Sequence, residues 1–194
     1  MKQDVIESGV IYHIFNRGNN KENIFIETKN YYYFLERFKK YILPIADIYS
    51  YCLLKNHFHL LLKIKEEHEL PEKFKDKPHL AFSNFFNSYT KSINKMYGRT
   101  GSLFEEHLKR KRVENIDYLI HLVAYIHLNP VKHGFTKNYQ NYKFSSFQAY
   151  VSEKPTEIDK DFILNLIEKD SFLDWHDMQR IKMETIKMYF DQDK

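Results

Sequence analysis

Two histidines separated by one residue, His57 and His59, are the side chains best suited to chemistry. Apolar runs at 51–54 and 60–64 flank them, and such runs, bounded by charged residues, are typical of buried strands. Because side chains alternate along a strand, both imidazoles face one side, about 7 Å apart. The pair can bind one metal ion, or it can be a packed or surface pair, so it needs a partner elsewhere in the chain.

A second pair of candidates lies in a helical pattern that begins with Asn115 as its cap and ends at Asn129, before Pro130. Tyr125 and Asn129 are four residues apart and therefore share a helix face, with His121 one turn earlier. On one interpretation the phenol is a nucleophile and the amide oxygen a third metal ligand. On the other, Tyr125 packs in the core and Asn129 caps the helix. The spacing alone favours the second interpretation.

The elements that must position these residues follow a recognisable order. Alternating or β-rich segments predict strands, and apolar residues at helical spacing predict helices. The expected strands cover 9–15, 45–54, 57–64 and 110–113, and the expected helices 28–43, capped by Thr28, and 79–97. The order strand, helix, strand, strand, helix, strand predicts an α+β, ferredoxin-like (RRM-like) antiparallel sheet with helices on one face.

The C-terminal part adds helices to this unit. A short helical piece is expected within 142–150, a linker at 153–156, and one or two amphipathic helices between 159 and about 190. We therefore predict a main domain at 1–150 and a C-terminal helical extension at 151–194.

Composition is that of a soluble globular protein, with 194 residues, 43% hydrophobic and 29% charged. No run of 18 apolar residues predicts a membrane span, and the first ten residues lack the apolar centre of a signal peptide. The single cysteine, Cys52, excludes a disulfide within the chain. These features together predict a cytoplasmic protein.

Positive charge is mild overall, at +4, but it is concentrated at 109–112, where four cations are consecutive. This cluster is either a phosphate-binding strip or a solvated surface. Arg17, at the end of the first strand, has the same two interpretations. The 15 Tyr and 16 Phe suit stacking on unpaired bases, although most of them fit a core.

Taken together, five segments resemble the single-tyrosine HUH transposases, and most closely the REP-associated tyrosine transposases. The first two carry the family's His-hydrophobic-His motif and its later Tyr-Ile-x-x-Asn-Pro-Val helix. The other three resemble its opening strand with an Asn-Arg-Gly turn, a glycine-led segment, and its Tyr-x-Trp-Ser-Ser tail, with Phe144 in place of Trp. The His-hydrophobic-His motif is at 56–59 and the tyrosine helix motif at 125–134. The opening strand and turn are at 12–18, the glycine-led segment at 101–104 and the tail at 142–146. The resemblance covers about residues 8–150 and leaves the last forty or so unexplained.

The resemblance implies a substrate and a mechanism. The substrate would be single-stranded DNA beside a hairpin or repeat. His57 and His59 would hold one divalent cation, Mg²⁺ or Mn²⁺, with Asn129 as the third protein ligand, and Mn²⁺ should bind the imidazoles more tightly. Tyr125 would attack the phosphorus, giving a 5′-phosphotyrosine and a free 3′-hydroxyl, and the reverse step would join strands without ATP. The base that takes the phenol proton stays open among His121, His127 and a metal-bound water.

The DNA contacts that we expect from charge and position are Asn16, Arg17, Lys109, Arg110, Lys111, Arg112, Lys132 and His133. A non-catalytic single-stranded nucleic-acid-binding module is the main alternative. A hydrolase with a water nucleophile would need further carboxylate or histidine ligands, and none lies at obvious spacing. A domesticated nuclease that processes repeats would keep the same residues. Monomer and homodimer both stay open, as does whether Tyr125 meets its own His57 or a partner's.

Overall fold

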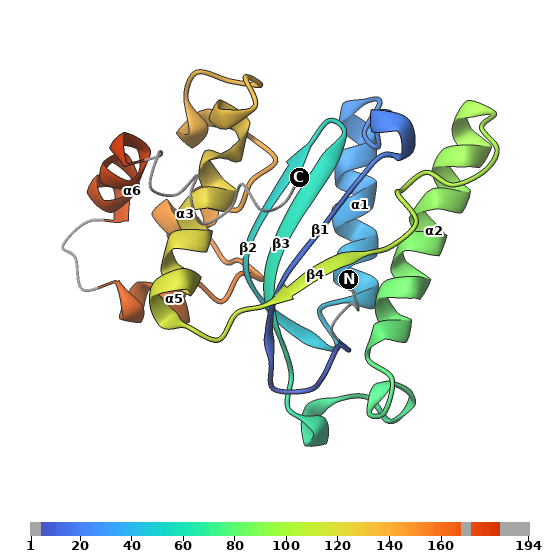
Figure 1. Ribbon diagram of the computed structural model, residues 1–194, viewed down its shortest axis with the longest axis horizontal. Coiled ribbons are helices and arrows are strands. Elements are labelled where there is room, and N and C mark those ends of the chain that lie inside the picture. Colours follow the sequence, from blue (N-terminus) through green and yellow to red (C-terminus); the bar gives the residue numbers. More distant parts are fainter. Residues whose placement is uncertain (1–4, 168–171, 183–194) are drawn as a thin grey trace.

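A computed structural model describes residues 5–167 and 172–182 of the chain. Its centre is a four-stranded antiparallel sheet in the order β2-β3-β1-β4 (Figure 1). The strands are β1 (Ile11–Arg17), β2 (Ala46–Leu54), β3 (His57–Ile64) and β4 (Lys109–Arg112). This arrangement confirms the predicted α+β, ferredoxin-like architecture.

One face of the sheet carries α1 (Thr28–Tyr41) and α2 (His79–Tyr97), as predicted. Phe58 of β3 projects between them, within contact of Phe34 and Phe86, because every second residue of β3 faces this side. Short 3₁₀ helices lie in the connections. They are η1 (Asn19–Lys21), η2 (Glu67–Glu69), η3 (Glu72–Phe74) and η4 (Tyr139–Asn141).

The start of α1 differs from the prediction. Glu27, not Thr28, is the N-cap, and its carboxylate accepts a hydrogen bond from the backbone of Asn30. The Asn30 side chain accepts from the Glu27 backbone in return, at 2.8 Å. Because this reciprocal pair satisfies two helix-end donors, the helix begins one residue earlier than a lone threonine cap would place it.

The other face of the sheet carries α3 (Ile116–Lys132), with Asn115 as the predicted cap. The prediction that this helix ends at Asn129 was wrong, since it continues through Pro130 to Lys132. Pro130 cannot donate a backbone hydrogen bond, but the turn that contains it is closed by His133 N donating to Asn129 O at 3.0 Å. As a result, Lys132 and the cap residue His133 lie on the end of the helix that carries Tyr125.

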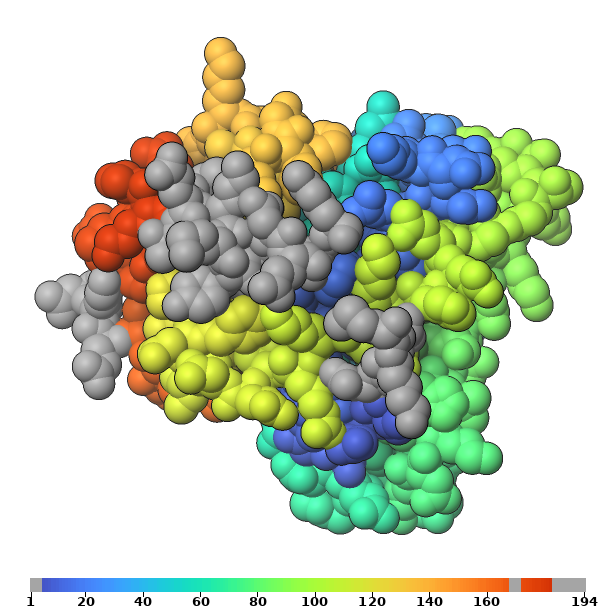
Figure 2. Space-filling view, in the orientation of Figure 1, coloured from blue at the N-terminus to red at the C-terminus, as the bar shows by residue number. Residues whose placement is uncertain are grey.

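Behind α3 lie α4 (Phe147–Val151), α5 (Lys160–Leu166) and α6 (Phe172–Ile181), which share a second core with β2 and β3. The segment 144–146 covers the free edge of β2, through Leu53 N to Phe144 O at 2.8 Å and Ser146 N to Tyr51 O at 2.9 Å. In the space-filling view, α2 and α3 lie on opposite sides of the segment that leads into β4 (Figure 2).

The C-terminal extension is part of this second core, with Ile163 and Trp175 buried in it. Ile158 also pairs with Ile48 of β2. The domain boundary at residue 150 stays a prediction, and the predicted helical residues 168–171 and 183–190 lie outside the described ones. Among the residues that the structure describes, no helix has the length and apolar character that a membrane span requires.

Candidate functional site

Strand register brings the candidate residues of β1 and β3 together. Arg17 lies opposite His57, and Phe15 lies opposite His59. His13 is diagonal to His59 on the same face, since His13 itself pairs with Leu61. These side chains all point away from the α1 and α2 core, toward α3.

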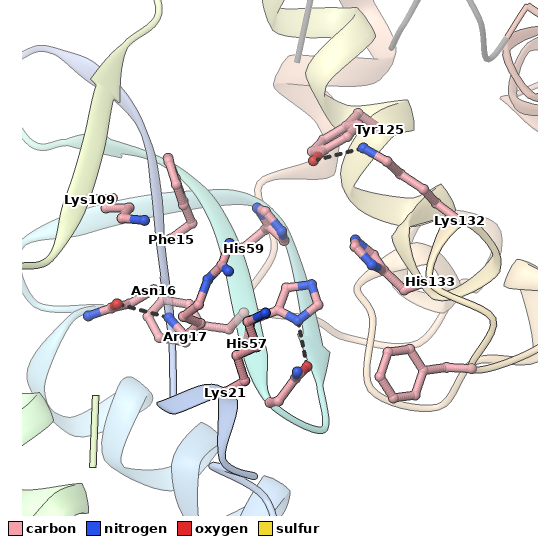
Figure 3. Close-up of a pocket in the computed structure, with 13 residues that line it drawn as sticks. Phe15, Asn16, Arg17, Lys21, His57, His59, Lys109, Tyr125, Lys132 and His133 are labelled. Atoms are coloured by element: carbon pink, nitrogen blue, oxygen red, sulfur yellow. Dashed lines mark hydrogen bonds between the residues drawn. The ribbon is translucent and has the colours of Figure 1, made fainter. Parts of the chain in front are cut away.

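Between this face and the C-terminal end of α3 lies a hollow of about 450 Å³. Figure 3 shows Tyr125, Lys132 and His133 pointing into it from α3, and Arg17, His57 and His59 from the strands. Of the residues predicted from the sequence, it brings together Asn16, Arg17, His57, His59, Lys109, Tyr125, Lys132 and His133. Five other residues complete its lining, namely Phe15, Lys21, Asn56, Phe58 and Phe135.

The two imidazoles of β3 have one nitrogen engaged each. His57 Nδ1 is 2.8 Å from Asn56 Oδ1, and His59 Nδ1 is 3.0 Å from His13 Nε2. Their ring centroids are 5.4 Å apart. With both Nδ1 atoms engaged, the two Nε2 atoms are left to bind an ion.

Burial keeps both imidazoles neutral. It is the main cause that lowers the pKa of His57 to about 3, followed by the positive charge of His133 and Arg17. Burial also lowers the pKa of His59 well below its ordinary value. A neutral imidazole is the form that binds a metal ion, so no proton has to be displaced at neutral pH.

Tyr125 lies edge-on to His59, with ring centroids 5.6 Å apart. The Lys132 ammonium is 4.7 Å from the centre of the Tyr125 ring and makes a long 3.5 Å contact with its hydroxyl. The phenol is therefore beside the imidazole pair and beside a fixed positive charge, which would stabilise negative charge on its oxygen.

Asn129 does not line the hollow but is completely buried behind Tyr125. Its Nδ2 donates to the Tyr125 carbonyl oxygen at 3.0 Å, while its Oδ1 has no hydrogen-bond partner among the described residues. A buried amide oxygen without a partner is costly. Such an oxygen fits a metal ligand, and two imidazole nitrogens with one amide oxygen suit Mn²⁺ and related divalent ions.

The four cations of 109–112 do not form one strip, because alternate residues of a strand face opposite sides. Lys109 lines the hollow. Lys111 is on the same face, but its ammonium lies 5.0 Å from the ring of Tyr118. Arg110 and Arg112 face the other side, where Arg112 pairs with Glu7. Of the four, only Lys109 lines the hollow.

The hollow is suited to an anion. Four cations line the hollow, namely Arg17, Lys21, Lys109 and Lys132. Arg17 and Lys109 pair with Glu105, at 3.5 and 3.3 Å. None of the described residues that line the hollow is an aspartate or a glutamate. The side chain of Asn16 is already hydrogen-bonded within the chain, since its Nδ2 donates to Glu105 O and its Oδ1 accepts from Arg17 N.

The two histidines considered as a base do not line the hollow. His121 donates through Nδ1 to the Asp117 carbonyl oxygen at 2.6 Å. His127 is fully buried, with its ring bonded to Ser50 and His176. Tyr125 and His127 are two residues apart on a helix, so they project to nearly opposite sides.

His13 is the residue that the sequence analysis missed. It is 1% exposed and stacks on both Phe15 and His59, at centroid distances of 4.7 and 5.2 Å. The available signal was a polar side chain in a β-rich run, two residues before Phe15. Its contact with His59 depends on the β1–β3 register, which the local pattern does not give.

A comparison with protein-family models and with curated protein sequences gives no match. Among solved structures, the chain is similar to one described as a REP-associated tyrosine transposase bound to a REP hairpin. The two share 21% identity with a TM-score of 0.56, over 80% of this chain and 87% of that one. At this identity, the likeness shows a shared fold.

Proposed function

We propose that the protein is a metal-dependent single-stranded DNA transposase or endonuclease of the REP-associated tyrosine transposase family. The observation that carries this proposal is the position of Tyr125, beside two neutral imidazoles in a cationic hollow. The fold shared with the REP-associated transposase supports it.

The residues that would hold the ion are His57 and His59, through Nε2, and Asn129, through its unpartnered Oδ1. When bound, a divalent ion supplies Lewis-acid polarisation of the scissile phosphate. We expect Mg²⁺ or Mn²⁺, with tighter binding of Mn²⁺ because imidazole is the softer ligand.

Tyr125 carries the covalent step. Its hydroxyl oxygen attacks phosphorus and loses its proton, while the bond from phosphorus to the 3′ oxygen breaks and that oxygen takes up a proton. The products are a 5′-phosphotyrosine and a free 3′-hydroxyl. Attack by a 3′-hydroxyl on this ester reverses the step and rejoins the strand without ATP. The Lys132 ammonium, 3.5 Å from the phenol oxygen, stabilises the oxygen whenever it carries charge.

Arg17, Lys109 and Lys132 would contact phosphates on either side of the scissile one, because all three line the hollow. We carry the hairpin over to this chain from the structural neighbour, which is bound to one. Because Tyr125 lies edge-on to His59 of its own chain, with ring centroids 5.6 Å apart, the tyrosine and the imidazole would act together within one copy.

The alternative of a binding module is less well supported. Such modules stack bases on an open sheet face. Here α3 packs on β2 and part of β3 on that face, and His13, Phe15 and His59 stack on one another beside it.

A covalent-adduct assay tests the proposal. The protein is incubated with labelled single-stranded hairpin DNA and Mn²⁺ or Mg²⁺, then separated on a denaturing gel. We expect a metal-dependent adduct that disappears in Tyr125→Phe and in His57→Ala, a loss of at least about 10³-fold, since the nucleophile or a metal ligand is gone.

Two matched controls accompany it. Tyr118→Phe, on the same helix, and His68→Ala, an exposed histidine, should form the adduct normally. An adduct that survives Tyr125→Phe would show that another tyrosine is the nucleophile. Tight metal-independent DNA binding with no adduct would instead favour the binding module.

A further inference from the structure

We propose that His13 is a positioning residue for the metal site, which accepts a hydrogen bond from His59 Nδ1–H and thereby fixes the imidazole that binds the ion. The inference rests on the proposed function only for the presence of that ion. It assigns a role to a buried side chain that the chemistry of Tyr125 leaves unexplained.

The contact between the two rings is direct. His13 Nε2 lies 3.0 Å from His59 Nδ1, and the rings stack with an interplanar angle of 17°. Both also lie edge-on to Tyr125, at centroid distances of 6.4 Å for His13 and 5.6 Å for His59. The two imidazoles therefore both contact the phenol ring. A rotation of either one would disturb the other imidazole and the position of Tyr125.

Burial ensures that His13 stays neutral. It lowers the pKa of His13 to about 3, with a smaller contribution from the charge of Lys111. Both rings are buried, with exposed fractions of 1% for His13 and 5% for His59, and a neutral imidazole carries one proton. The only freedom left is which of its two nitrogens carries it.

Two placements of these two protons satisfy the contact. In the first, His13 Nε2–H donates to His59 Nδ1, and His59 carries its own proton on Nε2, facing the hollow. In the second, His59 Nδ1–H donates to His13 Nε2, and the proton of His13 is on Nδ1. Only the second leaves His59 Nε2 with a free lone pair, so an ion selects it and no net proton is released.

The other nitrogen of His13 explains why both placements remain accessible. Nδ1 of His13 is buried with no hydrogen-bond partner among the described residues. A carbonyl oxygen there would fix the second placement, and an N–H group would fix the first. Since neither group is present among the described residues, the group that binds His59 Nε2 determines which of the two proton placements is adopted. Groups that hydrogen-bond to metal-bound histidines in this way typically contribute 10- to 100-fold in affinity.

The test measures metal binding without DNA, so it does not depend on cleavage. Mn²⁺ affinity is measured by calorimetry for the whole protein, for His13→Phe and for His13→Gln. Phenylalanine keeps the ring and removes the acceptor, while glutamine keeps an acceptor near the position of Nε2. We expect about 10- to 100-fold weaker binding in His13→Phe and affinity close to the wild type in His13→Gln.

A spectroscopic measurement tests the proton placement itself. With ¹⁵N-labelled protein and Zn²⁺ as a diamagnetic probe, nitrogen-15 correlation spectra should show the proton of His13 on Nδ1 once the ion is bound. Wild-type affinity in His13→Phe would overturn the inference, as would equal losses in both variants or a proton that stays on Nε2 of His13. If the adduct assay fails but these metal-binding results are obtained, the proposed transposase activity is wrong and the proposed metal site stands.

Discussion

His127 of α3 and His176 of α6 form a buried hydrogen bond of 2.8 Å, and His13 and His59 form another of 3.0 Å on the Tyr125 side of α3. The two pairs are chemically alike, both neutral and both surrounded by aromatic rings. They differ in what the outer nitrogens contact, and on our proposal this difference separates a structural pair from a functional one.

In the first pair every nitrogen has a partner, and the proton positions follow. The Phe172 carbonyl oxygen can only accept, so His176 Nδ1 carries the proton in that 3.0 Å contact. His176 Nε2 then accepts from His127 Nδ1–H. The remaining nitrogen, His127 Nε2, accepts from Ser50 or Ser146, at 3.1 and 2.8 Å. The chain of hydrogen bonds has one direction only.

In the second pair both outer nitrogens lack such a constraint. His13 Nδ1 has no partner among the described residues, and His59 lines the hollow. A fully satisfied network makes one rigid arrangement favourable, whereas a partly satisfied one keeps a second arrangement available for a ligand. The first pair thus anchors α6 to the helix of the proposed nucleophile, and the second pair would adapt to the proposed ion.

The comparison is tested most strongly by His127→Phe. The change leaves His176 Nε2 without its partner and removes the buried acceptor shared by the Ser50 and Ser146 hydroxyls, so we expect a loss of about 3 kcal/mol of unfolding free energy. Urea unfolding followed by circular dichroism measures it. Mn²⁺ affinity of the folded variant should not change, because His127 points away from the hollow. In contrast to His127→Phe, the control His121→Phe should cost at most about 0.5 kcal/mol.

An equal loss of unfolding free energy in His127→Phe and His121→Phe would show that the hydrogen-bond network of His127 adds no stability. Weakened Mn²⁺ binding in the folded His127→Phe variant would contradict the separation of the two pairs.

Acid should destabilise the protein through the same network. Burial lowers the pKa of His176 to about 3 and that of His127 well below its ordinary value. Unfolded histidines take up protons below pH about 6.5, and the folded ones do not, so this stability is complete above 6.5 and is lost as the pH falls toward 3. Between pH 7 and 5 we expect a loss of about 2 kcal/mol for each such histidine.

The measurement is urea unfolding at pH 7 and pH 5, for the wild type and for His176→Phe. The variant lacks one of these groups, so its loss on acidification should be about 2 kcal/mol smaller. The prediction fails when the two proteins respond to pH alike.

The smallest effect is expected for Ser50→Ala. Ser146 remains within 2.8 Å of His127 Nε2, so the nitrogen keeps a donor, and the cost should be about 1 kcal/mol or less. Removing both serine hydroxyls leaves that nitrogen unpaired. In a double-mutant cycle by urea unfolding, the double variant should therefore lose more than the two single variants together. Strict additivity would mean that the serines do not share this acceptor.

Much of the fold follows from the sequence because local patterns carry it. The two-residue period of β3 places His57 and His59 on one face, and Asn115 caps α3 as its side chain predicts. The errors are local too. Glu27 caps α1 because of its reciprocal bond with Asn30, and α3 continues past Pro130, where the bond from His133 N to Asn129 O closes its last turn.

The geometry of the site depends on contacts between distant segments, which the local sequence pattern does not predict. His13 reaches His59 only through the β1–β3 register, although the two are 46 residues apart in the chain. Pairing of β4 with β1 turns Lys109 toward the hollow and Arg110 away from it. The packing of α6 on α3 gives the buried His127 its hydrogen-bond partner, His176. Residue type and spacing thus determined which side chains were available for chemistry, because alternation along a strand or helix is a local property. Which of them meet was decided by register and packing between distant segments, because these minimise the free energy of the whole core.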